Sequence, residues 1–385
     1  MTSTVFINTR IFINGRFTDG AALVIGGGRV IAVSSETGAM EADRIVDAGG
    51  RIIAPGFVDV QVNGGGGALF NDDPSPETIE TIAAAHRRFG VTSLLPTLIS
   101  DDVAKIERAI AAVDAAIDAQ APGVVGLHVE GPFLNREKRG IHDDDKIRPL
   151  SDDVVELLCA PRRGALVVTL APECVDHAQI SRLAAAGVRV CAGHTNATYD
   201  EARAALNAGV VGFTHLFNAM SPLQSRAPGV IAAALESDAW CGVIVDGRHV
   251  HPAMLRLALR AKADGRFMLV SDAMPAVGAD IDHFYLGERR IEVRNGVCLS
   301  EDGTLAGAAL DLNAAVRNAV SMLNVDPATA LTMASEAPSQ FLGLSEEVGR
   351  LAPGARADFV VLSADLNVEE VWIGGEPALP AGLTA

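Results

Sequence analysis

Positive charge is scarce in this sequence of 385 residues. Lysine and arginine together number 31, against 48 aspartates and glutamates, which leaves a net charge of −17. Nucleic acids and anionic membranes attract net positive charge, so this balance argues against both as partners. It does not exclude an anionic substrate, because salt screens distant charges within about 10 Å and an anion needs only a few local donors.

Signals of secretion and of membrane insertion are also missing. The five cysteines are odd in number and show no CxxC spacing, so we expect reduced thiols. The first residues do not combine a basic stretch with an apolar one, so we expect no secretory signal. No apolar run approaches the roughly 20 residues of a membrane span. Together these features predict a cytoplasmic protein.

Both ends of the chain differ from its middle. The N-terminal part contains short apolar segments, such as Val5–Ile7 and Ile11–Ile13, separated by turn residues, and the C-terminal part is similar. With 49% hydrophobic and 21% charged residues, the chain can also bury a large core. We predict a small β-sandwich domain formed by residues 1–54 and 345–385, with a larger domain, residues 55–344, inserted between them.

The middle of the chain alternates apolar strands with segments of helical periodicity, such as Pro76–Phe89 and Tyr199–Ala208. Nearly continuous apolar runs are typical of parallel strands that are buried on both faces. Eight such runs predict an α/β protein with a (β/α)8 TIM-like barrel. A doubly wound sheet is the rival interpretation, but no GxGxxG motif follows any of the strands. The predicted strands are Phe57–Val62, Thr92–Pro96, Val124–Val129, Ala165–Leu170, Val188–Ala192, Val211–Thr214, Gly242–Val245 and Phe267–Val270.

Metal-binding side chains gather at the predicted ends of the barrel strands, where this fold places its active sites. Glu130 follows the third strand, and His194 and His215 follow the fifth and the sixth. Two histidines and one carboxylate, with a fourth position left open, form a ligand set of catalytic zinc. The same set suits Fe(II), Co(II) or Mn(II). We therefore predict a divalent metal site, with zinc as the first choice.

Asp272 stands just beyond the last predicted strand, in Ser271-Asp272-Ala273. A carboxylate beside a metal site can act as general base in a hydrolysis and then as general acid toward the leaving amine. Asp272 could instead cap the N-terminus of a helix, because Ala-Met-Pro follows it.

In this order the residues resemble the amidohydrolase superfamily, and more closely its N-acetylglucosamine-6-phosphate deacetylase family. The resemblance covers nearly the whole chain. Its HxEGPFLN and THLFNAM stretches are specific to the family, whereas PGFxD alone marks only the superfamily. The matching stretches are PGFVDVQVNG (55–64), GLHVEGPFLN (126–135), AGHTNAT (192–198), THLFNAM (214–220), RAPG (226–229), DGRHV (246–250) and SDA (271–273).

The resemblance implies hydrolysis of the acetamide of N-acetylglucosamine 6-phosphate, in amino sugar catabolism. It implies that Glu130, His194 and His215 bind the metal, that Asp272 shuttles the proton, and that His249 orients or polarises the amide carbonyl. It also implies a homodimer in which Arg226 reaches the phosphate in the neighbouring active site. The residues that it assigns to sugar and phosphate are Ile141, His142, Asn218, Ala219, Arg226, Asp246, His249, Leu305, Ala306 and Gly307.

The first barrel strand departs from the wider superfamily, in which His-x-His is common. This chain has Gln61-Val62-Asn63 there, and neutral amides are poor ligands for a transition metal, so we predict one metal ion per subunit. Gln61 and Asn63 are then neighbours of the metal site, as is His128, which shares a strand face with Glu130. The loop after the third strand, with Lys138, could act as a mobile lid.

Three alternatives stay open at this point. The substrate could be the galacto epimer, N-acetylgalactosamine 6-phosphate, or an unphosphorylated N-acetyl sugar. The barrel could also be a non-catalytic binding module, although such a protein is expected to have lost ligands that this chain retains.

Overall fold

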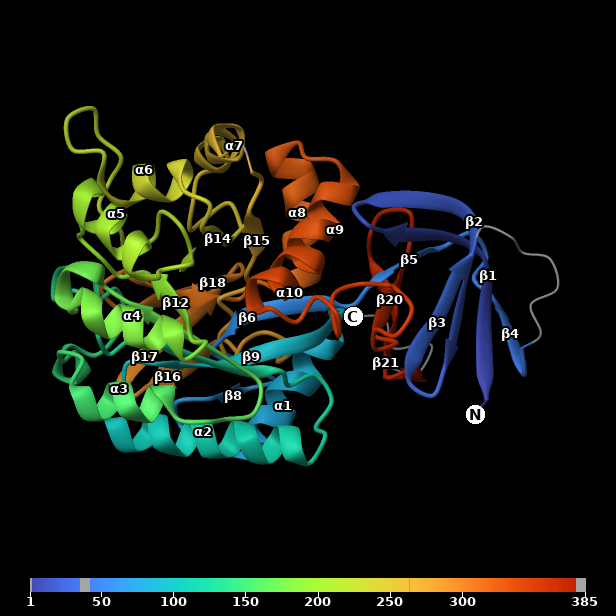
Figure 1. Cartoon of the computed structure of the whole chain (residues 1–385), viewed down its shortest axis with the longest axis horizontal. Coiled ribbons are helices and arrows are strands. Elements are labelled where there is room, and N and C mark those ends of the chain that lie inside the picture. The colour runs from blue at the N-terminus through green and yellow to red at the C-terminus, as the bar shows by residue number, and fades with distance from the viewer. Residues whose placement is uncertain (1, 35–41, 263, 379–385) are drawn as a thin grey trace.

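The computed structural model places a barrel beside a smaller β-sheet domain (Figure 1). The structure describes residues 2–34, 42–262 and 264–378. The predicted limits of the small domain also include residues 1, 35–41 and 379–385, which lie outside the described residues.

Eight parallel strands form the barrel, which confirms the predicted fold class. The backbone N–H of Asp272 donates to the carbonyl of Gln61 (3.0 Å), and that of Asn63 donates to Ala273 (2.9 Å). These two bonds close the barrel between its first and last strands, at the rim where the candidate site residues lie. The strands are β6 (Phe57–Val62), β9 (Val91–Ile99), β10 (Gly126–Glu130), β11 (Ala165–Leu170), β12 (Arg189–Ala192), β13 (Gly212–Phe213), β14 (Trp240–Val243) and β15 (Phe267–Leu269).

Helices surround the barrel and cover its strands (Figure 1). Local signals set several of their bounds: Thr198 and Glu201 form a reciprocal capping box at the start of α5, which has the predicted bounds. Within the described ranges, no helix has the length and apolar character needed to cross a bilayer. The helices are α1 (Pro76–Arg87), α2 (Val103–Asp118), α3 (Asp152–Cys159), α4 (His177–Ala185), α5 (Tyr199–Ala208), α6 (Gly229–Glu236), α7 (Pro252–Ala261), α8 (Leu312–Leu323), α9 (Pro327–Ala334) and α10 (Glu336–Leu342).

The two ends of the chain meet in one eight-stranded sheet, in which β20 pairs with β5. The sheet curls back on itself. The N–H of Val30, on the edge strand β3, donates to the carbonyl of Ala355 (2.9 Å), which lies just before β20. Inside the curl, the ring of Phe6 packs edge-on against Phe359 and Trp372. The strands are β1 (Ser3–Ile13), β2 (Arg16–Gly26), β3 (Arg29–Ser34), β4 (Arg44–Asp47), β5 (Ile52–Pro55), β20 (Phe359–Leu362), β21 (Val368–Ile373) and β22 (Glu376–Pro377).

One N-terminal prediction was wrong in detail. Val5–Ile7 and Ile11–Ile13 belong to the single strand β1, which pairs with β2 along its whole length. The register shifts between Phe6 and Thr9, where Asn8 has a φ of 53°. A bulge of this kind absorbs the irregular pattern without ending the strand.

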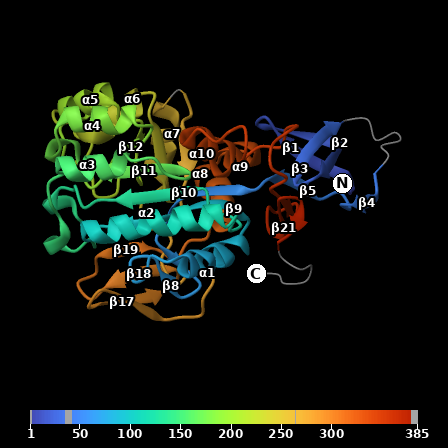
Figure 2. The same ribbon diagram turned by 60° about the horizontal axis from the view of Figure 1, so that its bottom comes forward.

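A second, smaller sheet lies on the barrel beside α1 and was not predicted (Figure 2). Its four antiparallel strands are β16 (His283–Leu286), β17 (Arg289–Arg294), β18 (Val297–Ser300) and β19 (Leu305–Ala308). Its apolar face packs on Met274 from the loop after β15 and on Leu69 from the short strand pair β7 (Gly64–Gly65) and β8 (Ala68–Leu69). The sheet therefore forms one wall of the rim.

Candidate active site

A cavity of about 460 Å³ opens at the ends of the barrel strands. Glu130 is the last residue of β10, while His194, His215 and Asp272 follow β12, β13 and β15 by two or three residues. The residues lining the cavity are Asn63, Ile99, Glu130, Glu137, Lys138, Gly140, Ile141, His142, His194, His215, Asn218, Ala219, His249, Asp272, Met274, Gly303, Thr304 and Leu305. The structure thus brings the predicted metal ligands and the predicted acid–base residue into one cavity.

Glu130, His194 and His215 form a tight, buried cluster. Oε1 of Glu130 lies 3.1 Å from Nε2 of His194 and 2.9 Å from Nε2 of His215. The side chains are 2–7% exposed. In the part of the chain that the structure describes, these three residues are the one group of metal-ligating side chains whose donor atoms converge within 4.8 Å. Two imidazoles and a carboxylate fit a divalent transition metal.

The ring of His194 is fixed in a state that suits a metal ligand. Its Nδ1 lies 2.8 Å from the carbonyl oxygen of Lys138, which can only accept a hydrogen bond. Nδ1 therefore carries a hydrogen, so the neutral ring has its lone pair on Nε2, the atom that faces Glu130 and His215. A backbone partner on the second ring nitrogen is a common feature of metal-binding histidines.

Two of the clustered residues, His194 and His215, have strained backbones, and so does Asp272 beside them. The φ angles of His194, His215 and Asp272 are 49°, 32° and 50°. These values lie in the left-handed region, which residues other than glycine rarely adopt. Each such residue costs about 1–3 kcal/mol and persists only where its surroundings hold it. The chain accepts this strain where it aims the three side chains into the cavity.

Charge in the cavity is set by burial and by the mutual proximity of these groups. Burial alone would raise the pKa of Glu130, but its close contacts with His194 and His215 outweigh burial and hold the pKa well below its ordinary value. The pKa of Asp272 is raised, first by burial and then by the charge of Glu130. Two nearby carboxyl groups with oppositely shifted pKa values suit a permanent ligand and a proton carrier.

Two neutral amides connect these carboxyl groups. Nε2 of Gln61 donates to Glu130 (3.1 Å) and to Asp272 (3.1 Å), and Nδ2 of Asn63 donates to Asp272 (2.7 Å). The amide nitrogens face the carboxylates and so serve as donors. His128 is buried nearby, but its ring nitrogens contact the hydroxyl groups of Thr97 and Thr169.

Asp272 does not cap a helix. The described residues after it form a turn and then β16, and no helix begins there. The helix-capping alternative was therefore wrong, because the backbone of Asp272 and Met274 hydrogen-bonds to β6 and β19 instead of starting a helix.

His142 reaches the cavity from the loop after β10. The backbone N–H of Ser100 points at Nδ1 of His142 (3.3 Å), and the Ser100 hydroxyl lies 2.7 Å from the same atom. An N–H group can only donate, so Nδ1 is the acceptor and Nε2 carries the hydrogen. Burial lowers the pKa of His142 well below its ordinary value. His142 is therefore a neutral hydrogen-bond donor.

His249 is held by a carboxylate in a similar way. Its Nδ1 lies 2.6 Å from Oδ2 of Asp246, whose other oxygen accepts the N–H groups of Arg248 and His249. Asp246 orients the ring from behind and does not line the cavity itself.

The other predicted substrate contacts divide into two groups. Ile141, Asn218, Ala219 and Leu305 line the cavity. Ala306, Gly307 and Arg226 do not; Arg226 is exposed on the loop before α6.

The backbone conformation and the close packing at position 307 explain why glycine stands there. Its φ is 59°, and a Cβ atom there would lie 2.6 Å from Met274 and 2.9 Å from the carbonyl oxygen of Asp272. Glycine at this position lets β19 approach the loop that carries Asp272.

Sequence patterns alone did not reveal several lining residues. Ile99 and Met274 are apolar, and no pattern showed that they face the cavity; for Met274 the one signal was its place two residues after Asp272. Gly303 and Thr304 come from the unpredicted sheet, where the Asp302-Gly303 turn was a detectable hairpin signal.

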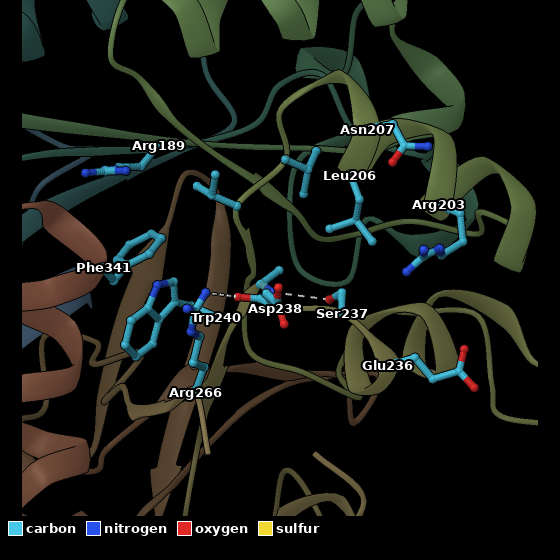
Figure 3. A pocket seen from close by; sticks show the side chains of 13 residues that line it. Arg189, Arg203, Leu206, Asn207, Glu236, Ser237, Asp238, Trp240, Arg266 and Phe341 are labelled. Atoms are coloured by element: carbon cyan, nitrogen blue, oxygen red, sulfur yellow. Dashed lines mark hydrogen bonds between the residues drawn. The ribbon is translucent and has the colours of Figure 1, made fainter. Parts of the chain in front are cut away.

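A second cavity, of about 530 Å³, lies where β12 and β14 begin, at the end of these strands that is opposite to the rim (Figure 3). None of its lining residues is a histidine or a cysteine. Arg189 and Arg203 lie on opposite sides of it, and Arg266 lies beside Trp240 and donates to the backbone of Asp238. Its cationic groups do not converge on one point, so the cavity at the rim is the candidate active site.

Comparison with known proteins identifies relatives along nearly the entire chain. The amidohydrolase family model matches residues 52–378. The N-acetylgalactosamine-6-phosphate deacetylase of Shewanella sp. (strain ANA-3) is 41% identical over 95% of this chain and 94% of its own. The human N-acetylglucosamine-6-phosphate deacetylase is 37% identical over 96% and 94%. The crystal structure of N-acetylglucosamine-6-phosphate deacetylase from Pasteurella multocida superposes with a TM-score of 0.94 at 34% identity, covering 97% of this chain and 99% of that one.

Proposed function

Because the chain belongs to the amidohydrolase family, and within it to the N-acetylglucosamine-6-phosphate deacetylases, we propose that it hydrolyses the acetamide of N-acetyl-D-glucosamine 6-phosphate. The products are D-glucosamine 6-phosphate and acetate, and the reaction belongs to amino sugar catabolism. The observation that carries the reaction type is the buried Glu130–His194–His215 cluster with Asp272 beside it. The sugar phosphate as substrate rests on the relatives.

One divalent metal ion per subunit, held by Glu130, His194 and His215, is part of this proposal. When bound, such an ion polarises a carbonyl and makes water more acidic. Zinc is the proposed metal, with iron, cobalt or manganese as alternatives. Gln61 and Asn63 direct amide nitrogens at carboxylates, which supports a single metal rather than two.

The chain's own residues supply proton transfer and orientation. Asp272 takes a proton from the attacking water and delivers it to the sugar nitrogen as the C–N bond breaks. Its raised pKa favours this second role, because the carboxyl group holds a proton more readily than an exposed aspartate. His249, held by Asp246, orients the amide carbonyl, and the neutral His142 donates a hydrogen bond to the substrate.

Cationic side chains are the usual partners of a phosphate group. Lys138 lines the cavity, whereas Arg226 is exposed outside it. We propose that the enzyme is a cytoplasmic homodimer and that Arg226 reaches the phosphate in the neighbouring active site. A planar guanidinium group suits bidentate contacts with phosphate oxygens.

N-acetylgalactosamine 6-phosphate is the second candidate substrate. The 41% identity to the Shewanella enzyme favours it, since that relative acts on the galacto epimer. Both candidates share the acetamide and the phosphate, so they use the same metal and acid–base residues.

The proposal is tested by acetate release from metal-loaded enzyme. We expect kcat/KM to be highest for N-acetylglucosamine 6-phosphate, lower for the galacto epimer, and lowest for unphosphorylated N-acetylglucosamine. A preference for the galacto epimer would select the second candidate. No acetate from either phosphosugar would contradict the proposed function.

A further inference from the structure

We infer that Glu173 is a positioning residue that holds the metal ligand His194 in its strained conformation. Glu173 follows β11, the strand that lies between the strands of Glu130 and His194 and contributes no metal ligand. It stands in the short turn Pro172–Cys174, three residues beyond the end of that strand. The inference rests on the metal site of the proposed function, but not on the identity of the substrate.

The carboxylate of Glu173 grips the two residues that follow His194. Its Oε2 accepts the hydroxyl of Thr195 at 2.5 Å, and its Oε1 accepts the backbone N–H of Asn196 at 2.6 Å. Charge-assisted hydrogen bonds of this length are stronger than those between neutral groups. The chain is therefore fixed immediately after the residue whose φ is 49°.

The same carboxylate also holds the segment that contacts His194 from the other side. Oε1 accepts Nδ2 of Asn135 at 2.9 Å, and the backbone N–H of Asn135 donates to the carbonyl of His194 at 3.0 Å. Asn135 in turn begins the 3-10 turn Arg136–Lys138, whose last carbonyl accepts the hydrogen of His194 Nδ1. Glu173 thus supports both the backbone and the ring of His194.

This arrangement predicts an effect on metal binding rather than on substrate binding. Glu173 does not line the cavity. Without its carboxylate, the residues around His194 can relax toward an unstrained backbone, and Nε2 then no longer points at Glu130 and His215. Loss of such an outer partner typically weakens metal affinity by about 10- to 100-fold.

The test measures the dissociation constant for Zn(II) by chelator competition in the full-length chain. We expect Glu173→Ala to raise this constant by about 10- to 100-fold, and Glu173→Gln, which keeps one acceptor oxygen, to raise it by less. At saturating zinc, both variants should recover wild-type KM, because no substrate contact has changed.

Glu201→Gln is the matched control. Glu201 is a nearby carboxylate that caps α5 through Thr198 and has no contact with His194. This variant should lose thermal stability while its zinc affinity stays within about twofold of the wild type. It separates loss of stability from loss of metal affinity.

The outcomes distinguish this inference from the proposed function. If folded Glu173→Ala binds zinc within about twofold of the wild type, or Glu173→Gln does so where the alanine variant does not fold, Glu173 is only a structural link. If the wild type itself binds no zinc, the metal-dependent function fails together with this inference. A different substrate preference would change neither the zinc affinity of the wild type nor that of the Glu173 variants.

Discussion

The Nε2 atoms of His194 and His215 lie 3.0 Å apart. Nδ1 of His194 donates its hydrogen to the carbonyl of Lys138, so in the neutral ring the Nε2 atom that faces His215 carries a lone pair. Glu130 adds a negative oxygen at about the same distance from both rings. A cation bound between these atoms interacts favourably with the lone pair and with the carboxylate. We therefore expect metal binding to stabilise the folded protein as well as to serve catalysis.

Removing the metal should therefore destabilise the protein. A ligand present at about 1,000 times its dissociation constant stabilises the folded state by about 4 kcal/mol. We expect the Tm to fall by several degrees in chelator and to recover when Zn(II) is added back. In Glu130→Gln the added metal should cause no such recovery; an equal recovery would mean that the metal binds elsewhere.

Asp272→Asn should lose catalysis without losing metal. The amide keeps the shape of the side chain but cannot carry the proton from water to the leaving nitrogen, and general acid–base groups contribute about 10²- to 10⁴-fold. We expect kcat to fall by at least about 100-fold while elemental analysis still finds one metal per subunit. Near-normal turnover with metal bound would exclude Asp272 as the proton carrier.

Ser100→Ala should weaken substrate binding through His142. The hydroxyl of Ser100 helps to hold Nδ1 of His142, although the backbone N–H remains. One neutral hydrogen bond is worth about 0.5–1.5 kcal/mol, so we expect KM to rise by roughly 2- to 10-fold with kcat little changed. Ser100→Thr, which keeps the hydroxyl, is the control and should retain most of the affinity. An unchanged KM in Ser100→Ala would show that the backbone contact suffices.

Arg226→Ala tests the proposed contact between subunits. We expect a raised KM for the phosphosugar, an unchanged metal content and a dimer in sedimentation experiments. Mixing Arg226→Ala subunits with Asp272→Asn subunits should then restore activity, because half of the mixed dimers' sites combine an intact Asp272 with an intact neighbouring Arg226. Mixtures that gain no activity would place the arginine outside the partner's site.

His86 should make the protein less stable in mild acid. It is buried, its Nε2 lies 2.9 Å from the carbonyl of Gly64, and burial lowers its pKa from 6.5 to about 4. Below pH 6.5 His86 takes up a proton in the unfolded chain, whereas in the folded protein it stays neutral down to about pH 4. The free energy of unfolding therefore falls as the pH drops through this window, by about 2 kcal/mol between neutrality and pH 5.

Denaturant unfolding at both pH values measures this dependence. His86→Gln, which does not titrate, should show a smaller loss of stability in acid than the wild type. Parallel losses in the two proteins would mean that other groups account for the pH dependence.

The barrel was predictable because its strands are buried on both faces and read as continuous apolar runs. Glu130, His194, His215 and Asp272 each stand at or just beyond the end of such a run, and parallel strands bring those ends to one rim. The sheet β16–β19 was missed for the opposite reason. Its strands have 4–6 residues and only one buried face, so charged residues such as Arg289 and Glu292 interrupt the apolar pattern.

Contacts between distant loops were also beyond the reach of sequence patterns. The bonds of Gln61 to Glu130 and Asp272 join residues 69 and 211 positions apart. The grip of Glu173 on Thr195 joins two different strand ends. No periodicity or motif spacing encodes such pairs, because they depend on how neighbouring strands are staggered around the barrel.

The left-handed backbone at His194, His215 and Asp272 has a consequence for engineering. Glycine or asparagine would occupy these positions at lower energy than the residues that are there. A screen that rewards only heat resistance of the metal-free protein would therefore favour the loss of its chemical groups one by one. Selection for robustness in this enzyme has to be carried out with the metal present and turnover monitored, or it will yield a sturdier and inactive barrel.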